Sequence, residues 1–216
     1  MFFKLVEFYD ITAVHLRLMS VTAVIILITS LFSVAALYIY PPLLSWGILQ
    51  PYRMIRKKTW HELFTSGFLH ANMGHLFLNM FVLFIFGVIL ERTIGEAHFI
   101  ALYASGILFS AFPSVFRFKD DPDFATLGAS GAVEAVLFGF ILLFPTESLY
   151  IMFIPVPIPA WLFGIAFLAY SIYASKSQGS RINHEAHIAG ALWGVIYILL
   201  FVPNTIDHLL TIFGVL

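Results

Sequence analysis

The sequence predicts an all-α polytopic membrane protein in which six transmembrane helices form a single domain over residues 1–216. Hydrophobic residues make up 61% of the chain and charged residues only 11%, and the mean hydropathy is +0.95. These values lie outside the range of soluble globular domains. Four apolar runs are plain, and each reaches the length of about 20 residues that a spanning helix needs, alone or with its polar lead-in; two more runs follow them. Little of the chain is left for a separate soluble domain.

The six runs can be bounded by the residues that flank them. The first ends in two tyrosines and two prolines, which is typical of an interfacial anchor and argues against a cleaved signal peptide. The second and fourth begin with polar residues, and the third is plainly apolar. The fifth follows the prolines of "PVPIP", so residues 149–154 are expected to be an irregular or interfacial lead-in. The sixth ends at Pro203. The expected spans are residues 21–40, 72–90, 97–116, 127–144, 159–175 and 186–202.

Composition and spacing exclude several classes of function. The chain has no cysteine, so it has no thiolate nucleophile, no disulfide framework and no cysteine metal site. A net charge of -1 gives no reason to expect a nucleic-acid partner. All aspartates lie outside the apolar runs, which argues against intramembrane aspartyl chemistry. In "NHEAH" the histidines His184 and His187 are three residues apart, not four as in a zinc-protease helix, so no metal or other cofactor is expected.

Polar residues gather at the starts of three of the expected spans. Consecutive spans alternate in direction, so the starts of the second, fourth and sixth share one face of the membrane. Polar groups at membrane depth cost free energy unless they are paired or line a watery cavity. Their shared depth therefore predicts one hydrated site between helices. The residues concerned are His70, His75, Asn79, Ser130, Glu134, His184 and His187.

Ser130 and His187 form the simplest catalytic pair in this set. A serine hydroxyl is a weak nucleophile until a base accepts its proton, and histidine has the suitable unperturbed pKa. Gly128 and Gly131 flank the serine and would let another helix or a substrate backbone approach its hydroxyl. On the sixth span, small residues recur every four positions, a stripe that permits close helix packing; they are Ala186, Gly190 and Gly194. If the stripe faces the fourth span, His187 comes within reach of Ser130.

The second span can supply donors for an oxyanion. Acyl transfer needs hydrogen bonds to the oxygen of the attacked carbonyl, and one such donor is worth about 3 kcal/mol. His75 and Asn79 are four residues apart, so their side chains lie on one face of a helix. Together with the N–H of Ser130 they are candidates for that role.

Each feature also has a structural explanation. A glycine–serine pair in a membrane helix is more often a packing surface, and a membrane histidine is often an interhelical hydrogen bond. Three clusters with complementary chemistry at matching helix ends favour catalysis. The alternative is a transporter or proton pathway in which Glu134 and the histidines relay protons or bind a solute, although no inverted repeat is evident.

Four motifs carry a family resemblance: "HANMGHLFLNM" at His70–Met80, "ERTIG" at Glu91–Gly95, "GASG" at Gly128–Gly131 and "AHIAGALWG" at Ala186–Gly194. In content and order they resemble the rhomboid family of intramembrane serine proteases. The resemblance implies a six-helix rhomboid-like bundle with a short central fourth span and Ser130 at the bottom of a water-filled cavity.

The same resemblance implies roles for individual residues. Ser130 would be the nucleophile, His187 its general base, and His75 and Asn79 the oxyanion donors. His70 would order the entrance of the second span, Glu91 and Arg92 would brace the opposite end, and the loop Pro41–His61, with Trp60 near its end, would lie partly in the membrane. The partners would be transmembrane segments of other proteins, cut within the lipid bilayer near their outer ends. A catalytically inactive, client-binding relative is the other alternative.

The sequence departs from the family pattern at two positions. The tryptophan-arginine pair common in the first loop reads Trp60-His61, so the way this loop is held cannot be transferred by analogy. The residue one turn after the serine, often aromatic in the family, is Glu134. An isolated charge at membrane depth is costly, so Glu134 is expected to be protonated unless it is hydrated or paired. One hypothesis is a hydrogen bond at or near His187 that orients it; the alternative is a neutral carboxyl bonded to a neighbouring helix or water.

The resemblance also implies a location. We expect a multi-pass integral protein of a bacterial plasma membrane, with the active site opening to the non-cytoplasmic side. The basic residues oppose that orientation, because the positive-inside tendency favours the opposite distribution. The inner side would hold Lys4, Arg17 and Arg92, and the outer side would hold Arg53, Arg56, Lys57, Lys58, Arg117, Lys119, Lys176 and Arg181.

Overall fold

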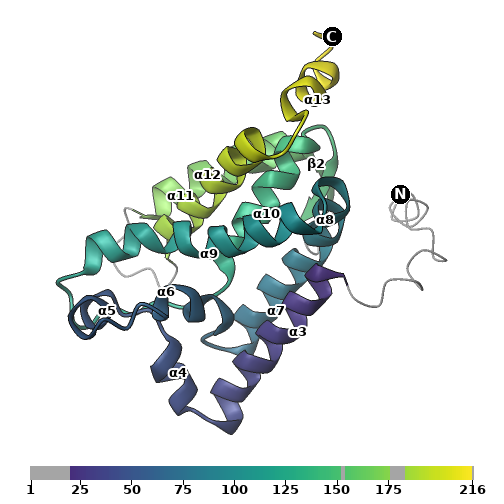
Figure 1. Cartoon of the computed structure of the whole chain (residues 1–216). Coiled ribbons are helices and arrows are strands. Elements are labelled where there is room, and N and C mark those ends of the chain that lie inside the picture. The colour runs from purple at the N-terminus through teal and green to yellow at the C-terminus, as the bar shows by residue number, and fades with distance from the viewer. Residues whose placement is uncertain (1–19, 152–153, 176–182, 216) are drawn as a thin grey trace.

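A computed structural model describes residues 20–151, 154–175 and 183–215 of the chain (Figure 1). It is a bundle of helices with one small hairpin, and Lys4, Arg17, Lys176 and Arg181 lie outside the described residues. The helices are α3 (Val21–Val34), α4 (Pro42–Gly47), α5 (Pro51–Lys57), α6 (Glu62–Thr65), α7 (Met73–Val82), α8 (Val88–Ile94), α9 (Glu96–Phe118), α10 (Ser130–Leu143), α11 (Ala160–Ser175), α12 (His184–Phe201) and α13 (Thr205–Ile212). Shorter turns of helix are η1 (Ala35–Ile39), η2 (Ser66–Phe68) and η3 (Leu83–Gly87), and the strands are β1 (Ser148–Ile151) and β2 (Ile154–Pro159).

The prediction of a helical membrane protein is confirmed. Within the described residues, four helices are long and apolar enough to cross a membrane: Val21–Ile39, Met73–Ile94, Glu96–Phe118 and His184–Phe201. The other two expected spans appear as shorter apolar helices, α10 and α11. The 14 residues of α10 rise about 21 Å, less than the hydrocarbon thickness of about 30 Å. If one end of α10 lies at a membrane surface, the other end therefore lies inside the membrane.

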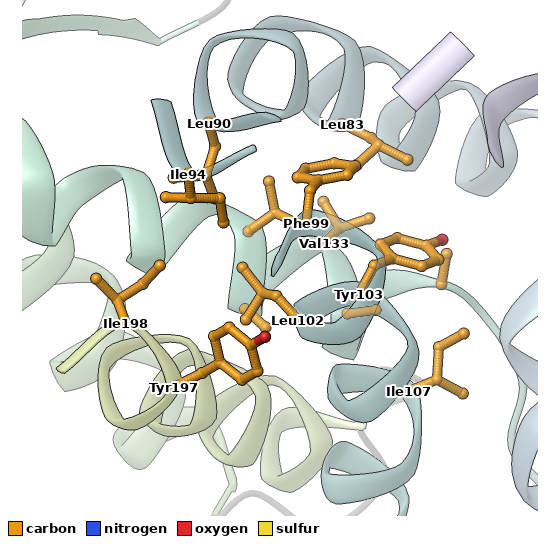
Figure 2. Packing of buried hydrophobic residues seen from close by; sticks show 14 of the residues in the cluster. Leu83, Leu90, Ile94, Phe99, Leu102, Tyr103, Ile107, Val133, Tyr197 and Ile198 are labelled. Atoms are coloured by element: carbon orange, nitrogen blue, oxygen red, sulfur yellow. The ribbon is translucent and has the colours of Figure 1, made fainter. Parts of the chain in front are cut away.

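The short helix α10 lies at the centre of the bundle. Nearly all of its side chains are buried, and it packs most extensively against α12 and then α9. Figure 2 shows the apolar cluster around it, in which Val133 of α10 lies among Phe99, Leu102 and Tyr103 of α9. Lipid tails are as apolar as these side chains, so close packing rather than a hydrophobic driving force holds such helices together.

Glycines set the close approach of α12 to α10. A Cβ atom at Gly190 would lie 2.0 Å from the carbonyl oxygen of Gly131, and one at Gly194 would lie 2.2 Å from that of Ala135. Any larger residue would push the two helices apart. The small-residue stripe of α12 thus faces α10, and this contact sets the distance between the serine helix and the histidine helix.

The loop between α3 and α7 is held by a buried carboxylate. Glu62 is 1% exposed and accepts hydrogen bonds from Gln50 N at 2.9 Å and Arg53 Nε at 2.8 Å, and also from the hydroxyl of Thr59. The Arg53 guanidinium donates further to the carbonyls of Ser45 at 2.9 Å and Ile48 at 3.0 Å. An ion pair centred on Glu62 therefore stabilises this loop.

Aromatic packing completes the loop. The ring of His61 stacks on Trp46 with centroids 4.7 Å apart, although Trp46 is 51% exposed and the neighbouring Trp60 is 53% exposed. Trp46, at the beginning of the loop, is thus the tryptophan that contacts His61.

A β-hairpin precedes α11, where an irregular lead-in was expected. Strands β1 and β2 are antiparallel, with Leu149 opposite Ile158 and Tyr150 opposite Pro157. The prolines of β2 occupy every second position, so their missing N–H groups all fall on one edge. The register of the pairing shifts between Tyr150 and Ile151, and at the other end of the hairpin Ala160 N donates to Glu147 O at 2.8 Å. Alternate prolines are compatible with an edge strand, and sequence inspection missed this.

Candidate active site

The nucleophile candidate lies at the first residue of α10, on a loop whose backbone is fixed on both sides. Gly128 has φ 129°, and a Cβ there would lie 2.6 Å from Cε1 of His75, so both conformation and space require glycine. Gly128 N donates to Ser66 O at 3.0 Å. Because Ser130 is the first helical residue, its own N–H has no acceptor within the helix and points out of the helix start.

His187 meets this serine from the first turn of α12. Its Nε2 atom lies 2.8 Å from Ser130 Oγ, within the range of a hydrogen bond between a nucleophile and its base. Phe167 of α11 stacks parallel to the His187 ring, with centroids 6.4 Å apart and planes inclined by 11°. The ring is thus held by its serine bond at one edge and by an aromatic face on one side.

His75 and Asn79 lie on α7. The N-cap of this helix is Asn72, whose Oδ1 accepts from His75 N at 2.9 Å and so fixes the start of the helix. Asn79 Nδ2 donates to His75 O at 2.9 Å, which uses one of its two hydrogens and leaves the other for a ligand. The His75 ring lies against Gly128, beside the serine loop.

One cavity of about 820 Å³ joins these residues. Ser130, His187, His75 and Asn79 all line it, together with Glu134. Most of its remaining wall is apolar and is supplied by Leu78, Val82, Leu137, Phe163 and Phe167. A nucleophile, a base and hydrogen-bond donors around one apolar cavity are the components that acyl transfer requires.

Comparison with known proteins gives this geometry a family. The sequence pattern described as "Rhomboid domain" matches residues 57–204, more than half of the chain. The chain belongs to the rhomboid family. The matched segment runs from the last residue of α5 to the residue before α13, and it contains every cavity residue named above.

Curated rhomboid proteins resemble the chain at moderate identity. It is 32% identical over 160 residues to "Rhomboid protein 1, mitochondrial" of Saccharomyces cerevisiae, covering 70% of this chain and 46% of that protein. It is 35% identical over 146 residues to "RHOMBOID-like protein 12, mitochondrial" of Arabidopsis thaliana, covering 61% and 43%. It is 31% identical over 139 residues to "Presenilin-associated rhomboid-like protein, mitochondrial" of Homo sapiens, covering 62% and 36%. The chain thus spans less than half the length of these relatives.

These names correct one expectation. A multi-pass integral membrane protein is supported, but a bacterial plasma membrane is not, because the relatives are mitochondrial proteins by name. The expectation was wrong because it came from the family in general. The lengths of spans and the motifs reflect the thickness and chemistry of a bilayer. Such sequence patterns alone do not distinguish a bacterial plasma membrane from a mitochondrial membrane.

His70 links the serine loop of this rhomboid-family chain to its first spanning helix. Its Nε2 atom accepts from Ala129 N at 3.4 Å, so Nδ1 carries the hydrogen and donates to Ser33 Oγ at 2.9 Å. The Ser33 hydroxyl donates in turn to Phe68 O at 3.0 Å. Burial, and secondarily the charge of His75, lowers the pKa of His70 to about 3. The neutral ring of His70 therefore holds the backbone of Ala129, the residue before Ser130.

Glu134 lines the cavity of this rhomboid-family chain, and the described residues show no hydrogen bond from it to His187. The buried Oε2 atom of Glu134 has no hydrogen-bond partner among these residues. Phe167 instead packs against the histidine ring. The hypothesis of a Glu134–His187 bond is therefore not supported by this structure, and an aromatic residue from a different helix occupies the place beside the ring.

Glu91 lies at the other end of the bundle. It is 4% exposed, and its carboxylate accepts from Val21 N at 2.9 Å and from Thr22 N and Oγ1 at 2.8 and 2.6 Å. It therefore caps the start of α3 from α8, where a carboxylate also opposes the positive end of the helix dipole. Arg92 follows it on the exposed side of α8.

Sequence reasoning missed residues that position the site. Asn183 is the N-cap of α12, with Oδ1 accepting from Ala186 N at 3.1 Å and Nδ2 donating to Ser114 Oγ of α9 at 2.7 Å. An asparagine directly before "HEAH" is a helix-start signal that could have revealed it. Phe167 and Ser33 carried no such signal, because their roles depend on which helices become neighbours.

Proposed function

We propose that this chain is an intramembrane serine endopeptidase that cleaves transmembrane segments of other membrane proteins. The observation that carries the proposal is the 2.8 Å contact between His187 Nε2 and Ser130 Oγ inside a cavity of the membrane bundle. Membership of the rhomboid family supports it.

In the first half of the reaction, Ser130 Oγ attacks the carbonyl carbon of the scissile peptide bond and its proton passes to His187 Nε2. Negative charge develops on the carbonyl oxygen. His75, the free hydrogen of Asn79 Nδ2 and the Ser130 N–H are the donors placed around the cavity to receive it. As the tetrahedral intermediate collapses, the C–N bond breaks and His187 returns the proton to the leaving amine, which leaves an acyl-serine.

In the second half, water attacks the acyl carbon while His187 accepts its proton. The C–Oγ bond then breaks, and the proton returns to Ser130. Within the described residues no carboxylate bonds to the His187 ring, so a dyad rather than a triad carries out both proton transfers.

Cleavage and labelling test this proposal together. In liposomes, purified protein should cut a transmembrane test substrate and react with a fluorophosphonate probe at Ser130. Ser130→Ala and His187→Ala should each lower cleavage by at least about a thousandfold, since a nucleophile and its base act as a unit. A transporter or an inactive client-binding protein would give neither cleavage nor labelling.

Matched substitutions separate chemistry from folding. Ser171→Ala changes a buried serine of α11, and His98→Asn changes a membrane histidine whose Nδ1 contacts Tyr197 Oη at 3.3 Å. Neither lines the cavity, so both variants should retain cleavage. Cleavage that survives Ser130→Ala, or probe attached to a different residue, would contradict the assignment.

We also infer that the chain resides in a mitochondrial membrane, on the basis of the names of its relatives. An antibody against the chain should detect it in the mitochondrial fraction of its source cells. There it should stay with the membrane after carbonate extraction, as expected of a protein with several spanning helices. Recovery in another membrane fraction would refute the inference.

A further inference from the structure

The cavity contains one carboxyl side chain, that of Glu134, which the proposed reaction does not use. Glu134 follows Ser130 by four residues on α10, so the two side chains lie on one face of the helix. Side chains of a helix lean toward its N-terminus, which turns the carboxyl back toward the serine. Glu134 therefore lies in the cavity one turn beyond the nucleophile.

One oxygen of this carboxyl has no partner in the described part of the chain. This oxygen is the buried Oε2 atom. Two polar groups of the same cavity bond to other residues: His187 Nε2 contacts Ser130 Oγ at 2.8 Å, and one hydrogen of Asn79 Nδ2 goes to His75 O at 2.9 Å. A buried carboxyl oxygen without a partner is rare in folded proteins and indicates a role or a missing partner.

The walls around Glu134 suggest the chemistry of that missing partner. Leu137 lies three residues beyond Glu134 on α10, and Leu78, Val82 and Phe163 also line the cavity, whose wall is largely apolar. An apolar pocket with one polar group is suited to a ligand that has an apolar stem and a polar end. Lysine and arginine side chains have that form, and a cation compensates a buried carboxylate more fully than a neutral donor does.

The distance along the helix favours a long side chain. Four residues of α-helix rise about 6 Å, and the attacked carbonyl must lie within about 3.5 Å of Ser130 Oγ. A serine or threonine next to that carbonyl is too short to reach far beyond the nucleophile. The four-carbon stem of lysine, or the arginine stem, extends in the required direction past Ser130.

We propose that Glu134 is a specificity-determining residue that binds a basic side chain, lysine or arginine, on the substrate residue whose carbonyl Ser130 attacks. This inference rests on the proposed peptidase function and defines its substrate class. Basic residues in spanning segments concentrate near the membrane interface, where a segment cut close to its end would present one.

A matched substrate panel tests the inference. Four otherwise identical transmembrane substrates would carry Lys, Met, Gln or Glu immediately before the scissile bond, with Met as the uncharged analogue of similar length. In liposomes, wild-type protein should cleave the Lys substrate at least about tenfold faster in kcat/KM than the Met substrate, because a site built to bond a polar group rejects the analogue that lacks it. It should cleave the Glu substrate most slowly.

Variants of Glu134 should change this order. Glu134→Gln keeps a polar group without charge and should reduce the Lys-to-Met ratio to within about threefold. Glu134→Lys should reverse the preference toward the Glu substrate. Each ratio is measured within a single variant, so a general loss of activity does not affect it. Glu147→Gln makes the same chemical change at an exposed position outside the cavity and should leave the ratio at the wild-type value.

The outcomes separate this inference from the proposed function. If wild-type protein cleaves the Lys and Met substrates equally, or if Glu134→Gln leaves the ratio unchanged, Glu134 does not determine specificity and the peptidase proposal stands. If a neutral Gln substrate is preferred over Lys, the carboxyl acts as a neutral group and the basic-substrate inference is refuted. If no substrate is cleaved and Ser130 is not labelled, the peptidase proposal itself fails.

Discussion

At the scale of single residues, the aromatic contact to His187 comes from position 167 and not from position 134. An aromatic residue is often found one turn after the serine in rhomboids, packed on the catalytic histidine. Here Phe167 of α11 stacks on His187, and Glu134 is left facing the cavity. Because the histidine ring is held from another helix, position 134 is free to contact a substrate.

His70 gives the fold a pH dependence whose sign follows from its burial. Its pKa is about 3 in the folded protein, whereas an unfolded histidine titrates near about 6.5. Between these values the unfolded chain binds more protons, so the contribution of His70 is complete above about pH 6.5 and declines as the pH falls toward 3. We expect the unfolding temperature in detergent to fall with acidification, with a loss on the order of 2 kcal/mol near pH 5.

Two variants identify the source of that slope. His70→Gln removes the titrating ring and should flatten the dependence of unfolding temperature on pH. His61→Gln changes an exposed histidine and should leave the slope as it is. If His70→Gln shows the full wild-type slope, other groups account for the acid sensitivity.

At the scale of elements, the contact between α10 and α12 decides whether the serine meets the histidine. Gly190→Ala would place a methyl group 2.0 Å from the Gly131 carbonyl. We expect the helices to separate, with a loss of about 1–3 kcal/mol of stability and at least a tenfold loss of cleavage, since small misplacements of reacting groups are costly.

Gly164→Ala is the control for that prediction. Its new methyl group would lie 3.4 Å from a side-chain carbon of Ile141, an ordinary contact, so α11 should tolerate it. Activity and unfolding temperature are measured for both variants. Equal behaviour of the two would show that the α10–α12 distance is not critical.

The elements also show where sequence patterns were sufficient. Apolar runs located the long helices, because a lipid-facing helix needs apolar residues on nearly every side. They did not reveal the β-hairpin, because proline is typical of a break in a helix, whereas the prolines at positions 155, 157 and 159 lie in a strand here. Nor did they reveal the Glu62–Arg53 pair, whose members are nine residues apart and meet only through the turn between α5 and α6.

At the scale of the whole molecule, the bundle presents apolar side chains outward as well as inward. Large exposed hydrophobic residues occur on α3, α7, α11 and α12, among them Leu31, Phe77, Ile165 and Leu200. In water such a surface would aggregate. In a bilayer it contacts lipid, whereas the cavity lined by Ser130 and His187 lies between the helices of the bundle.

The sequence by itself determined the membrane class, the approximate spans and the three groups of polar residues at matching helix ends. These follow from composition, run length and the alternation of direction, which are local or topological properties of a chain in a bilayer. The motifs also indicated the rhomboid family, to which the chain belongs.

Only the tertiary structure decided which groups touch. His187 approaches Ser130 to 2.8 Å, and Phe167 stacks on His187. Ser33 bonds to His70, and Oε2 of Glu134 is left without a partner. Each of these outcomes depends on residues from different parts of the chain. Such contacts depend on the rotation and spacing of neighbouring helices. Side-chain volumes across an entire interface set these quantities, and no single segment of the sequence contains them.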